Sequence, residues 1–210
     1  FEKYKKFVSN NKVYIGYNMR FNPILLQVKK LIGNKKVWSI NLVCSSFLPF
    51  WRSRNYTKVY SSSKKYGGGV LLDLSHEIDY LQWIFGKIKI DNVFNKKISN
   101  LKISSDDYLS LLGSIGNKTR FNLELNYFSK YPMRRMLIEG NHISLDVNLI
   151  KKQIFINEKN KQKKLKVPKF SRNFSYIKMH ESILKQKREN LCNLEEGLKL
   201  MKLIDYIRKK

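Results

Sequence analysis

Residues 67–86 read GGGVLLDLSHEIDYLQWIFG, a run of three glycines that leads into an amphipathic segment. Apolar side chains recur at positions 70, 71, 74, 78, 81 and 84, which is the spacing of one buried helical stripe. Gly86 stands where the residue after a helix C-terminus belongs. The stretch therefore predicts a helix that begins after Gly69 and ends before Gly86.

The predicted helix carries groups suited to acid–base chemistry. Asp73, His76 and Tyr80 share a second face of it. A histidine with a carboxylate three residues before it can be held in one tautomer and accept a proton near neutral pH. The glycines would let the backbone approach a ligand closely and leave the first helical amides free for a polar group. The alternative interpretation is a hydrogen-bonded structural histidine.

Residues 48–66 form an irregular stretch rich in arginine, tyrosine and serine. Their planar and cationic side chains suit stacking on sugar rings and gripping carboxylate or phosphate. These side chains are Trp51, Arg52, Arg54, Tyr56 and Tyr60. We interpret this long loop, which precedes a glycine-hinged helix, as a substrate lid. The alternative is a packed surface loop in which Trp51 is buried.

The elements before this loop are predicted from short-range signals. Residues 13–20 read as a strand, which would place Asn18 and Arg20 on one face near its end. Asn22 is a good N-cap and Pro23 suits a first turn, so a helix is predicted that stops at Gly33. A short helix at residues 1–9 and a strand at residues 36–47 complete this part.

The region after Gly86 has the sequence pattern of β-strands joined by turns. Phe121, Leu123 and Leu125 alternate with polar residues, so one face of this strand is buried and the other is polar. Strands are predicted at residues 87–98, 108–115, 119–128, 133–139, 142–147 and 153–157, and helices at residues 175–188 and 194–208. The expected fold class is α+β, a large open, mainly antiparallel β-sheet with helices packed on one face.

The chain of 210 residues is 42% hydrophobic and has a formal net charge of +26. Its length and apolar content predict a single domain with a substantial core. The charge raises the question of nucleic-acid binding. Lysine, asparagine and isoleucine are over-used along the whole length, which favours compositional drift instead. The basic run at residues 159–169 holds no aromatic ring and predicts a solvated loop.

The sequence contains no apolar run of eighteen residues and no signal-peptide pattern. We therefore expect a cytoplasmic protein without a membrane span. Cys44 and Cys192 predict reduced structural thiols, and His142 and His180 lack acidic or cysteine partners at useful spacing. No metal site is expected.

Several motifs follow one another along the chain. Residues 13–23 end in an Asn-x-Arg-Phe-x-Pro turn, residues 48–61 contain Leu-Pro-Phe-Trp-Arg, Asn-Tyr and Tyr-Ser, and residues 195–198 read Glu-Glu-Gly-Leu. Together with the three glycines, Asp73, His76 and Asp79, this order resembles the second domain of the Gfo/Idh/MocA oxidoreductases, the glucose-fructose oxidoreductase and inositol dehydrogenase family. Residues 1–210 are therefore interpreted as one C-terminal domain of that family.

The resemblance implies an NAD(P)-dependent oxidoreductase that moves hydride between nicotinamide and a sugar or sugar-nucleotide hydroxyl or ketone. His76 would be the catalytic base and Asp73 its orienting partner, although many family members place this aspartate four residues before the histidine rather than three. Asp79 would brace the helix or reach a sugar hydroxyl. The other residues expected to bind substrate or frame the nicotinamide are Asn18, Arg20, Trp51, Arg52 and Tyr56.

Two family features are missing from the sequence. It has neither the G-x-G-x-x-G fingerprint of a dinucleotide-binding domain nor the Glu-Lys-Pro segment with its catalytic lysine. We therefore expect NAD or NADP to bind in an N-terminal domain that this chain lacks. The resemblance also implies a homo-oligomer that pairs subunits through the sheet face. Two alternatives stay open: a non-catalytic assembly remnant of such an enzyme, and a basic nucleic-acid-binding module.

Overall fold

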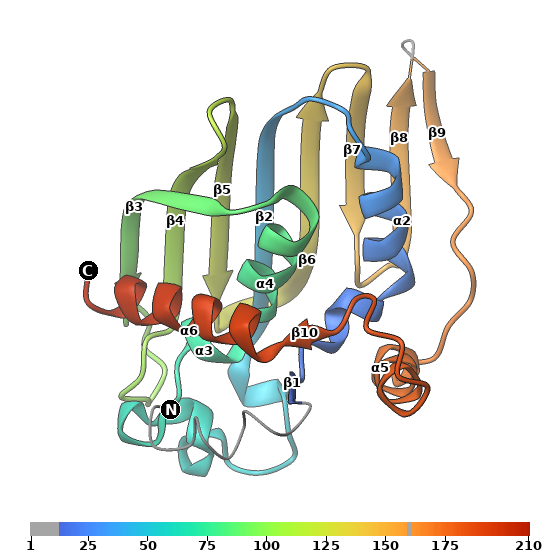
Figure 1. Ribbon diagram of the computed structural model, residues 1–210. Coiled ribbons are helices and arrows are strands. Elements are labelled where there is room, and N and C mark those ends of the chain that lie inside the picture. Colours follow the sequence, from blue (N-terminus) through green and yellow to red (C-terminus); the bar gives the residue numbers. More distant parts are fainter. Residues whose placement is uncertain (1–12, 159–160) are drawn as a thin grey trace.

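The centre of the molecule is a wide β-sheet (Figure 1). The computed structural model describes residues 13–158 and 161–210, and within them the sheet has eight strands in the order β3-β4-β5-β2-β6-β7-β8-β9. Neighbouring strands are antiparallel except β2 and β5, which are parallel. The strands are β2 (Val37–Phe47), β3 (Ile88–Lys96), β4 (Tyr108–Ile115), β5 (Thr119–Asn126), β6 (Phe128–Gly140), β7 (Ile143–Asn148), β8 (Gln153–Glu158) and β9 (Lys161–Leu165).

Helices cover one face of this sheet, with α2, α4 and α6 lying across it on the same side (Figure 1). On β5, Phe121, Leu123 and Leu125 are buried under them, while Asn122 between them is exposed. The alternation predicted for this strand and the α+β fold class are both confirmed. The helices are α2 (Pro23–Ile32), α3 (Val70–Asp73), α4 (His76–Phe85), α5 (Phe174–Leu184) and α6 (Leu194–Arg208).

Capping groups set the ends of two of these helices. Asn22 Oδ1 accepts a hydrogen bond from the Ile24 amide at 2.9 Å, and α2 ends at Gly33, whose φ is +46°. At the start of α6, Asn193 Oδ1 accepts from the Glu196 amide at 2.9 Å, and the Glu196 carboxylate accepts from the Asn193 amide at 3.1 Å. Both helices lie where the sequence predicts them.

The strand predicted at residues 13–20 is wrong beyond its first residues. β1 (Tyr14–Ile15) pairs with β10 (Cys192–Asn193), and the chain then turns into the 3₁₀ helix η2 (Asn18–Phe21). The Asn18 amide bonds back to the Gly16 carbonyl at 2.9 Å, a contact that an extended strand does not allow. Asn18 and Arg20 therefore share no strand face, although both side chains are buried.

The helix predicted after the glycine run is interrupted. α3 ends at Asp73 and α4 begins at His76. The amides of Ser75 and Glu77 bond carbonyls three residues back, which tightens the backbone between the two helices. Asp73 and His76 consequently belong to different helices, and Tyr80, which was expected on their face, is 1% exposed within the core.

Other segments differ from their predictions in extent. The basic run expected to be a loop contains the edge strand β9, because Leu165 of β9 pairs with Ile154 of β8. β6 begins earlier than predicted, and α5 ends earlier, at Leu184. The irregular stretch after β2 is folded into 3₁₀ turns, η3 (Leu48–Phe50), η4 (Tyr56–Lys58), η5 (Tyr60–Ser62) and η6 (Lys64–Tyr66). The helix predicted at residues 1–9 lies outside the described residues.

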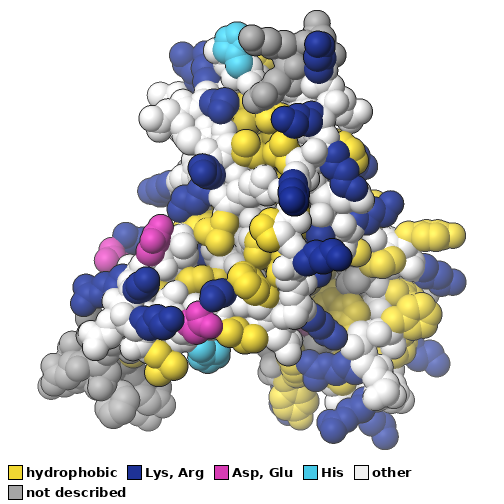
Figure 2. Space-filling model, turned by 90° about the vertical axis from the view of Figure 1, so that its right-hand side faces the viewer, with side chains coloured by type: hydrophobic (Ala, Val, Ile, Leu, Met, Phe, Trp, Pro, Cys, Tyr) yellow, Lys and Arg dark blue, Asp and Glu magenta, His cyan; other side chains and the backbone are white. Residues whose placement is uncertain are grey.

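Two surfaces of the molecule are relevant to the alternatives of nucleic-acid binding and of assembly through the sheet face. Figure 2 shows lysine and arginine side chains spread over the β9 side of the molecule, with hydrophobic side chains between them. The sheet face opposite the helices exposes large apolar side chains. Leu112 and Leu137, which alternate with buried neighbours, are 47% and 37% exposed, and Phe94 is 49% exposed. No helix in the described part of the chain is both long and apolar enough to cross a membrane.

Candidate active site

His76 is half-buried at the first turn of α4. The Tyr17 ring meets it edge to face, with 5.3 Å between ring centroids. Its Nδ1 is buried and has no hydrogen-bond partner among the described residues. Burial lowers the pKa of His76, while the charge of Glu77 raises it and that of Arg134 lowers it. The imidazole is therefore neutral at neutral pH, the state that a proton acceptor needs.

Asp73 lies at the end of α3 and bonds a tyrosine. Its Oδ2 accepts a hydrogen bond from the Tyr127 hydroxyl at 2.6 Å. Tyr127 is fully buried, and burial together with the charge of Asp73 raises its pKa, so the phenol stays a neutral donor. Trp51 packs edge-on against Tyr127, with ring centroids 5.2 Å apart. Oδ2 of Asp73 is thus engaged by Tyr127, and Nδ1 of His76 makes no hydrogen bond with Asp73.

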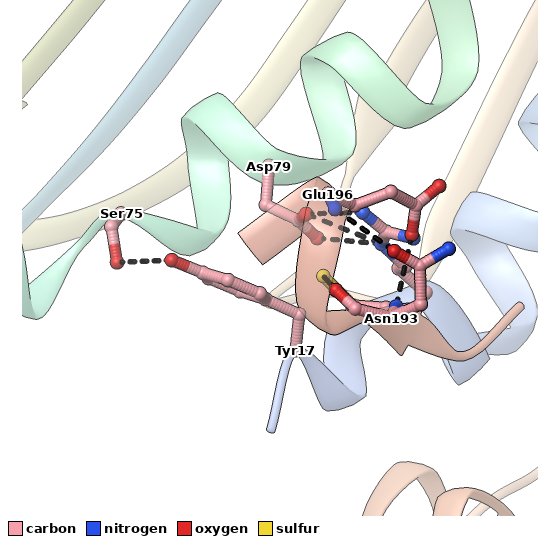
Figure 3. A network of polar contacts seen from close by, with 7 residues as sticks. Tyr17, Ser75, Asp79, Asn193 and Glu196 are labelled. Atoms are coloured by element: carbon pink, nitrogen blue, oxygen red, sulfur yellow. Dashed lines mark hydrogen bonds and ion pairs between the residues drawn. The ribbon is translucent and has the colours of Figure 1, made fainter. Parts of the chain in front are cut away.

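Arg20 connects η2 to α4 and α6 through Asp79 and Glu196, which are labelled in the network of Figure 3. Its Nη2 lies 2.7 Å from Asp79 Oδ1 on α4, its Nε bonds both oxygens of that carboxylate, and its Nη1 lies 2.8 Å from Glu196 Oε2 on α6. The side chains of Arg20 and Asp79 are 6% and 1% exposed. Burial alone would lower the pKa of Arg20, but the hydrogen bonds to Asp79 raise it above its usual value.

The same segment touches α4 at a second point. The Tyr17 hydroxyl lies 3.4 Å from Ser75 Oγ, the residue before His76 (Figure 3). Tyr17 and Arg20 therefore hold the first turn of α4 from the side of η2. Asp79 was predicted either to brace the helix or to reach a sugar hydroxyl. Its ion pair with Arg20 is consistent with the first role.

Glu77 is a buried carboxylate that the sequence analysis did not single out. It is 0% exposed, and its Oε1 accepts from Arg134 Nε at 2.6 Å. Its Oε2 is buried with no hydrogen-bond partner among the described residues. Arg134 stands opposite Cys44 in the β2–β6 register. The sequence showed only a charged residue next to the apolar stripe of the predicted helix. It could not show the partner of Glu77, because Arg134 lies on a strand far away in the sequence.

The loop predicted as a substrate lid is closed upon itself. Trp51 Nε1 donates to Ser46 Oγ at 2.8 Å, and the Arg52 guanidinium lies 5.9 Å from the Tyr60 ring centroid. The Tyr56 hydroxyl accepts from a backbone amide of the 97–107 loop at 3.2 Å. The space between these side chains is about 10 Å³, room for one water rather than a sugar. Binding of a sugar among them therefore requires the loop to move.

The glycine run packs against protein rather than facing a ligand. A Cβ on Gly69 would overlap the carboxylate of Asp106. That carboxylate accepts from the Leu71 amide at 3.1 Å, and the Asp106 carbonyl accepts from the Val70 amide at 3.0 Å. The prediction that the first helical amides are free is therefore wrong. The described residues do not fit a dinucleotide here, because an acidic side chain occupies the helix start where pyrophosphate would bind.

The site thus combines an open, mainly antiparallel sheet with a half-buried histidine at the start of α4 and carboxylates on α3 and α4. A family model described as "Oxidoreductase family, C-terminal alpha/beta domain" matches residues 29–210. The chain belongs to this family, the Gfo/Idh/MocA oxidoreductases. No curated protein matches the sequence.

Solved structures of low sequence identity share the fold. UDP-N-acetylglucosamine 3-dehydrogenase GnnA from Acidithiobacillus ferrooxidans has a TM-score of 0.76 and 15% identity, over 99% of this chain and 65% of its own. An oxidoreductase from Thermotoga maritima has a TM-score of 0.75 and 24% identity, over 98% and 63%. An NAD binding oxidoreductase from Klebsiella pneumoniae has a TM-score of 0.80 and 15% identity, over 99% and 66%. The chain thus spans less than two thirds of each of these proteins.

Proposed function

We propose that this chain is the substrate-binding and catalytic-base domain of an NAD(P)-dependent oxidoreductase acting on a sugar or sugar nucleotide. The observation that carries the proposal is His76, a half-buried neutral imidazole at the start of α4, beside the Asp73–Tyr127 pair. Membership of the oxidoreductase family supports the reaction class. The likeness to a UDP-N-acetylglucosamine 3-dehydrogenase supports the choice of a sugar nucleotide.

In this proposal His76 accepts the proton of the substrate hydroxyl that is oxidised. Its buried Nδ1 leaves Nε2 as the nitrogen available to the substrate. Asp73, held by Tyr127, borders the same site, and Asn18, Trp51, Arg52 and Tyr56 contact the sugar once the 48–66 loop opens. Arg20 and Asp79 hold α4 in place, with any substrate contact made from their ion pair.

Nicotinamide would supply the hydride acceptor or donor. Since the glycine run at the start of α3 does not fit a dinucleotide, we propose that NAD or NADP is bound by a separate N-terminal domain. The likeness to an NAD binding oxidoreductase supports this cofactor class. The mass of the polypeptide as its own cell makes it tests the arrangement, because such a domain adds roughly 120 residues.

Replacing His76 by alanine tests the assignment of the base. In the native enzyme, assayed for NAD(P)-dependent oxidation of sugar nucleotides, we expect kcat/KM to fall by about 10²–10⁴ because general-base catalysis is lost. His142→Ala is the matched control, since His142 is exposed in the β6–β7 turn. An unchanged kcat/KM in His76→Ala rejects the base. A native protein that binds no nicotinamide at all supports the non-catalytic assembly alternative.

We also propose that the open sheet face pairs two copies of the chain. The support is its exposed apolar side chains, among them Phe94, Leu112 and Leu137. Sedimentation equilibrium should then show a dimer, and Leu112→Arg should shift it toward monomer, because a charge would be buried in the interface. Lys118→Glu, in the exposed β4–β5 turn, is the control. A monomeric wild-type chain at high concentration contradicts this pairing.

A further inference from the structure

The 48–66 loop consists of two parts that the rest of the domain holds very differently. Its second part, residues 56–66, is bonded to the connection between β3 and β4, where Ser105 Oγ donates to the Ser61 carbonyl at 2.7 Å. Ser61 is 2% exposed, and a Cβ on Gly68 would overlap its carbonyl oxygen. Buried hydrogen bonds and close packing of this kind oppose local opening. We call residues 56–66 the fixed part of the loop.

The first part, residues 49–55, lies on the surface, and we call it the outer part. Every residue from position 50 to position 55 is exposed. Trp51 fastens this part to the domain, because its Nε1 donates to Ser46 Oγ at 2.8 Å and its ring meets the Tyr127 ring edge to face at 5.2 Å between centroids. The space between the outer and fixed parts is only about 10 Å³, so one of them must move to admit a sugar.

Tyr127 connects Trp51 to Asp73. Its hydroxyl donates to Asp73 Oδ2 at 2.6 Å, and its carbonyl accepts from the Leu48 amide, where the outer part begins, at 2.8 Å. Its own amide donates to the Asp107 carbonyl at 3.0 Å. One side chain therefore carries both the ring contact that seats the outer part and the hydrogen bond that orients the Asp73 carboxylate.

We propose that Trp51 and Tyr127 are positioning residues that couple the outer part of the loop to the Asp73 carboxylate. Only the outer part swings away when a sugar enters, and the Trp51 ring then leaves Tyr127. The Tyr127 ring gains freedom, and the orientation that its hydroxyl gives to Asp73 changes with it. The inference rests on the proposed function for its meaning in catalysis, whereas the coupling itself is measured without turnover.

Hydrogen exchange followed by mass spectrometry tests which part of the loop moves. In the wild-type chain, the amides of the outer part should exchange at least about tenfold faster than those of the fixed part. Trp51→Ala should raise the exchange rate of the outer part further and leave the fixed part unchanged, because the hydrogen bond to Ser46 and the contact with Tyr127 are lost. Equal exchange of the two parts overturns the inference.

The carboxyl ¹³C signal of Asp73, assigned by its loss in Asp73→Asn, tests the coupling. Trp51→Ala should shift this signal. In a Tyr127→Phe background the same substitution should leave it in place, because phenylalanine keeps the ring but has no hydroxyl to reach Asp73. Phe50→Ala is the matched control and should leave the signal in place, since Phe50 is 77% exposed and its ring contacts that of Phe47 at 4.8 Å.

Two results overturn the coupling: no shift of the Asp73 signal in Trp51→Ala, or a shift that persists in the Tyr127→Phe background. If Trp51→Ala does not fold, relaxation dispersion of the wild-type chain decides. The Trp51 indole N–H and the Asp73 carboxyl should then report one shared rate constant of conformational exchange, and two different rate constants contradict the inference.

Kinetics of the native enzyme give an independent readout. Trp51→Ala and Tyr127→Phe should each lower kcat/KM by about tenfold or more, because a misplaced carboxylate costs rate. The double variant should lose less than the product of the two single losses, since both act through one contact. A loss equal to that product means that the two residues act independently and overturns the coupling. A wild-type enzyme without NAD(P)-dependent turnover rejects the proposed function instead, and leaves the exchange and NMR results standing.

Discussion

Replacing Arg20 by methionine is expected to lower the free energy of unfolding by about 3–5 kcal/mol, the usual cost of removing one partner of a buried ion pair. The loss of unfolding free energy is large because the substitution leaves two carboxylates without their cationic partner. Asp79 is 1% exposed and would lose its bidentate partner, and Glu196 would lose its link to η2. Urea denaturation followed by circular dichroism measures the change. The comparison requires that wild type and variant have the same m value, the slope of the unfolding free energy against urea concentration.

The matched control is Arg120→Met. Arg120 pairs with Asp91 at 2.9 Å, but the two side chains are 73% and 37% exposed, so its loss should cost at most about 1 kcal/mol. Equal effects of Arg20→Met and Arg120→Met would contradict the importance of the buried network.

The deficit of Arg20→Met should also depend on pH. Burial raises the pKa of Asp79, and the hydrogen bonds from Arg20 oppose that rise. Without Arg20 the folded-state pKa rises further above the unfolded value, so the folded variant binds a proton that the unfolded chain does not. Its stability then increases as pH falls through that pKa. The gap from wild type should therefore be smaller at pH 5 than at pH 7, and a constant gap would argue against an ionised Asp79.

Replacing Gly69 by alanine is the second large expected effect. Gly69 has φ of +129° and ψ of 153°, a conformation essentially restricted to glycine, and a Cβ would overlap the carboxylate of Asp106. Backbone strain of about 1–3 kcal/mol adds to the displacement of Asp106 from the Leu71 amide that it caps. We expect the free energy of unfolding to fall by at least about 2 kcal/mol.

Gly16→Ala provides the comparison for this substitution. A Cβ on Gly16 has no heavy atom within 4 Å, so the variant should lie close to wild type in the same urea experiment. The start of α3 should also lose hydrogen-exchange protection in Gly69→Ala and keep it in Gly16→Ala. If Gly69→Ala is as stable as Gly16→Ala, the packing of the glycine run against Asp106 is not what selects glycine there.

Much of the fold could be predicted because its signals are local. Asn22 and Asn193 cap their helices through groups within three residues, and the alternation around Phe121 requires only that one face of the strand be buried. The helix after the glycines failed as a continuous element because the apolar spacing does not register a turn at Ser75. The strand β9, which pairs with β8, was not predicted because its residues are mostly lysines, which are typical of a solvated loop.

For the candidate site, residue types were predictable and partners were not. The motif order singled out Arg20, Asp73, His76 and Asp79, and the structure gathers all of them around α3, α4 and η2. Which carboxylate meets which donor was decided by segments far apart in sequence. For instance, Tyr127 donates a hydrogen bond to Asp73, 54 positions away in the sequence. From the sequence, Tyr127 could be predicted only to lie within a strand.

The sequence by itself determined the class of fold, the helix caps, the sheet alternation and the family, because these depend on periodicity and on contacts between near neighbours. Only the tertiary structure decided that Arg20 closes on Asp79 and Glu196, and that Arg134 lies against Glu77 beside His76. Such pairs form because a buried charge must find an opposite charge, and the nearest one in space is set by how sheet and helices pack.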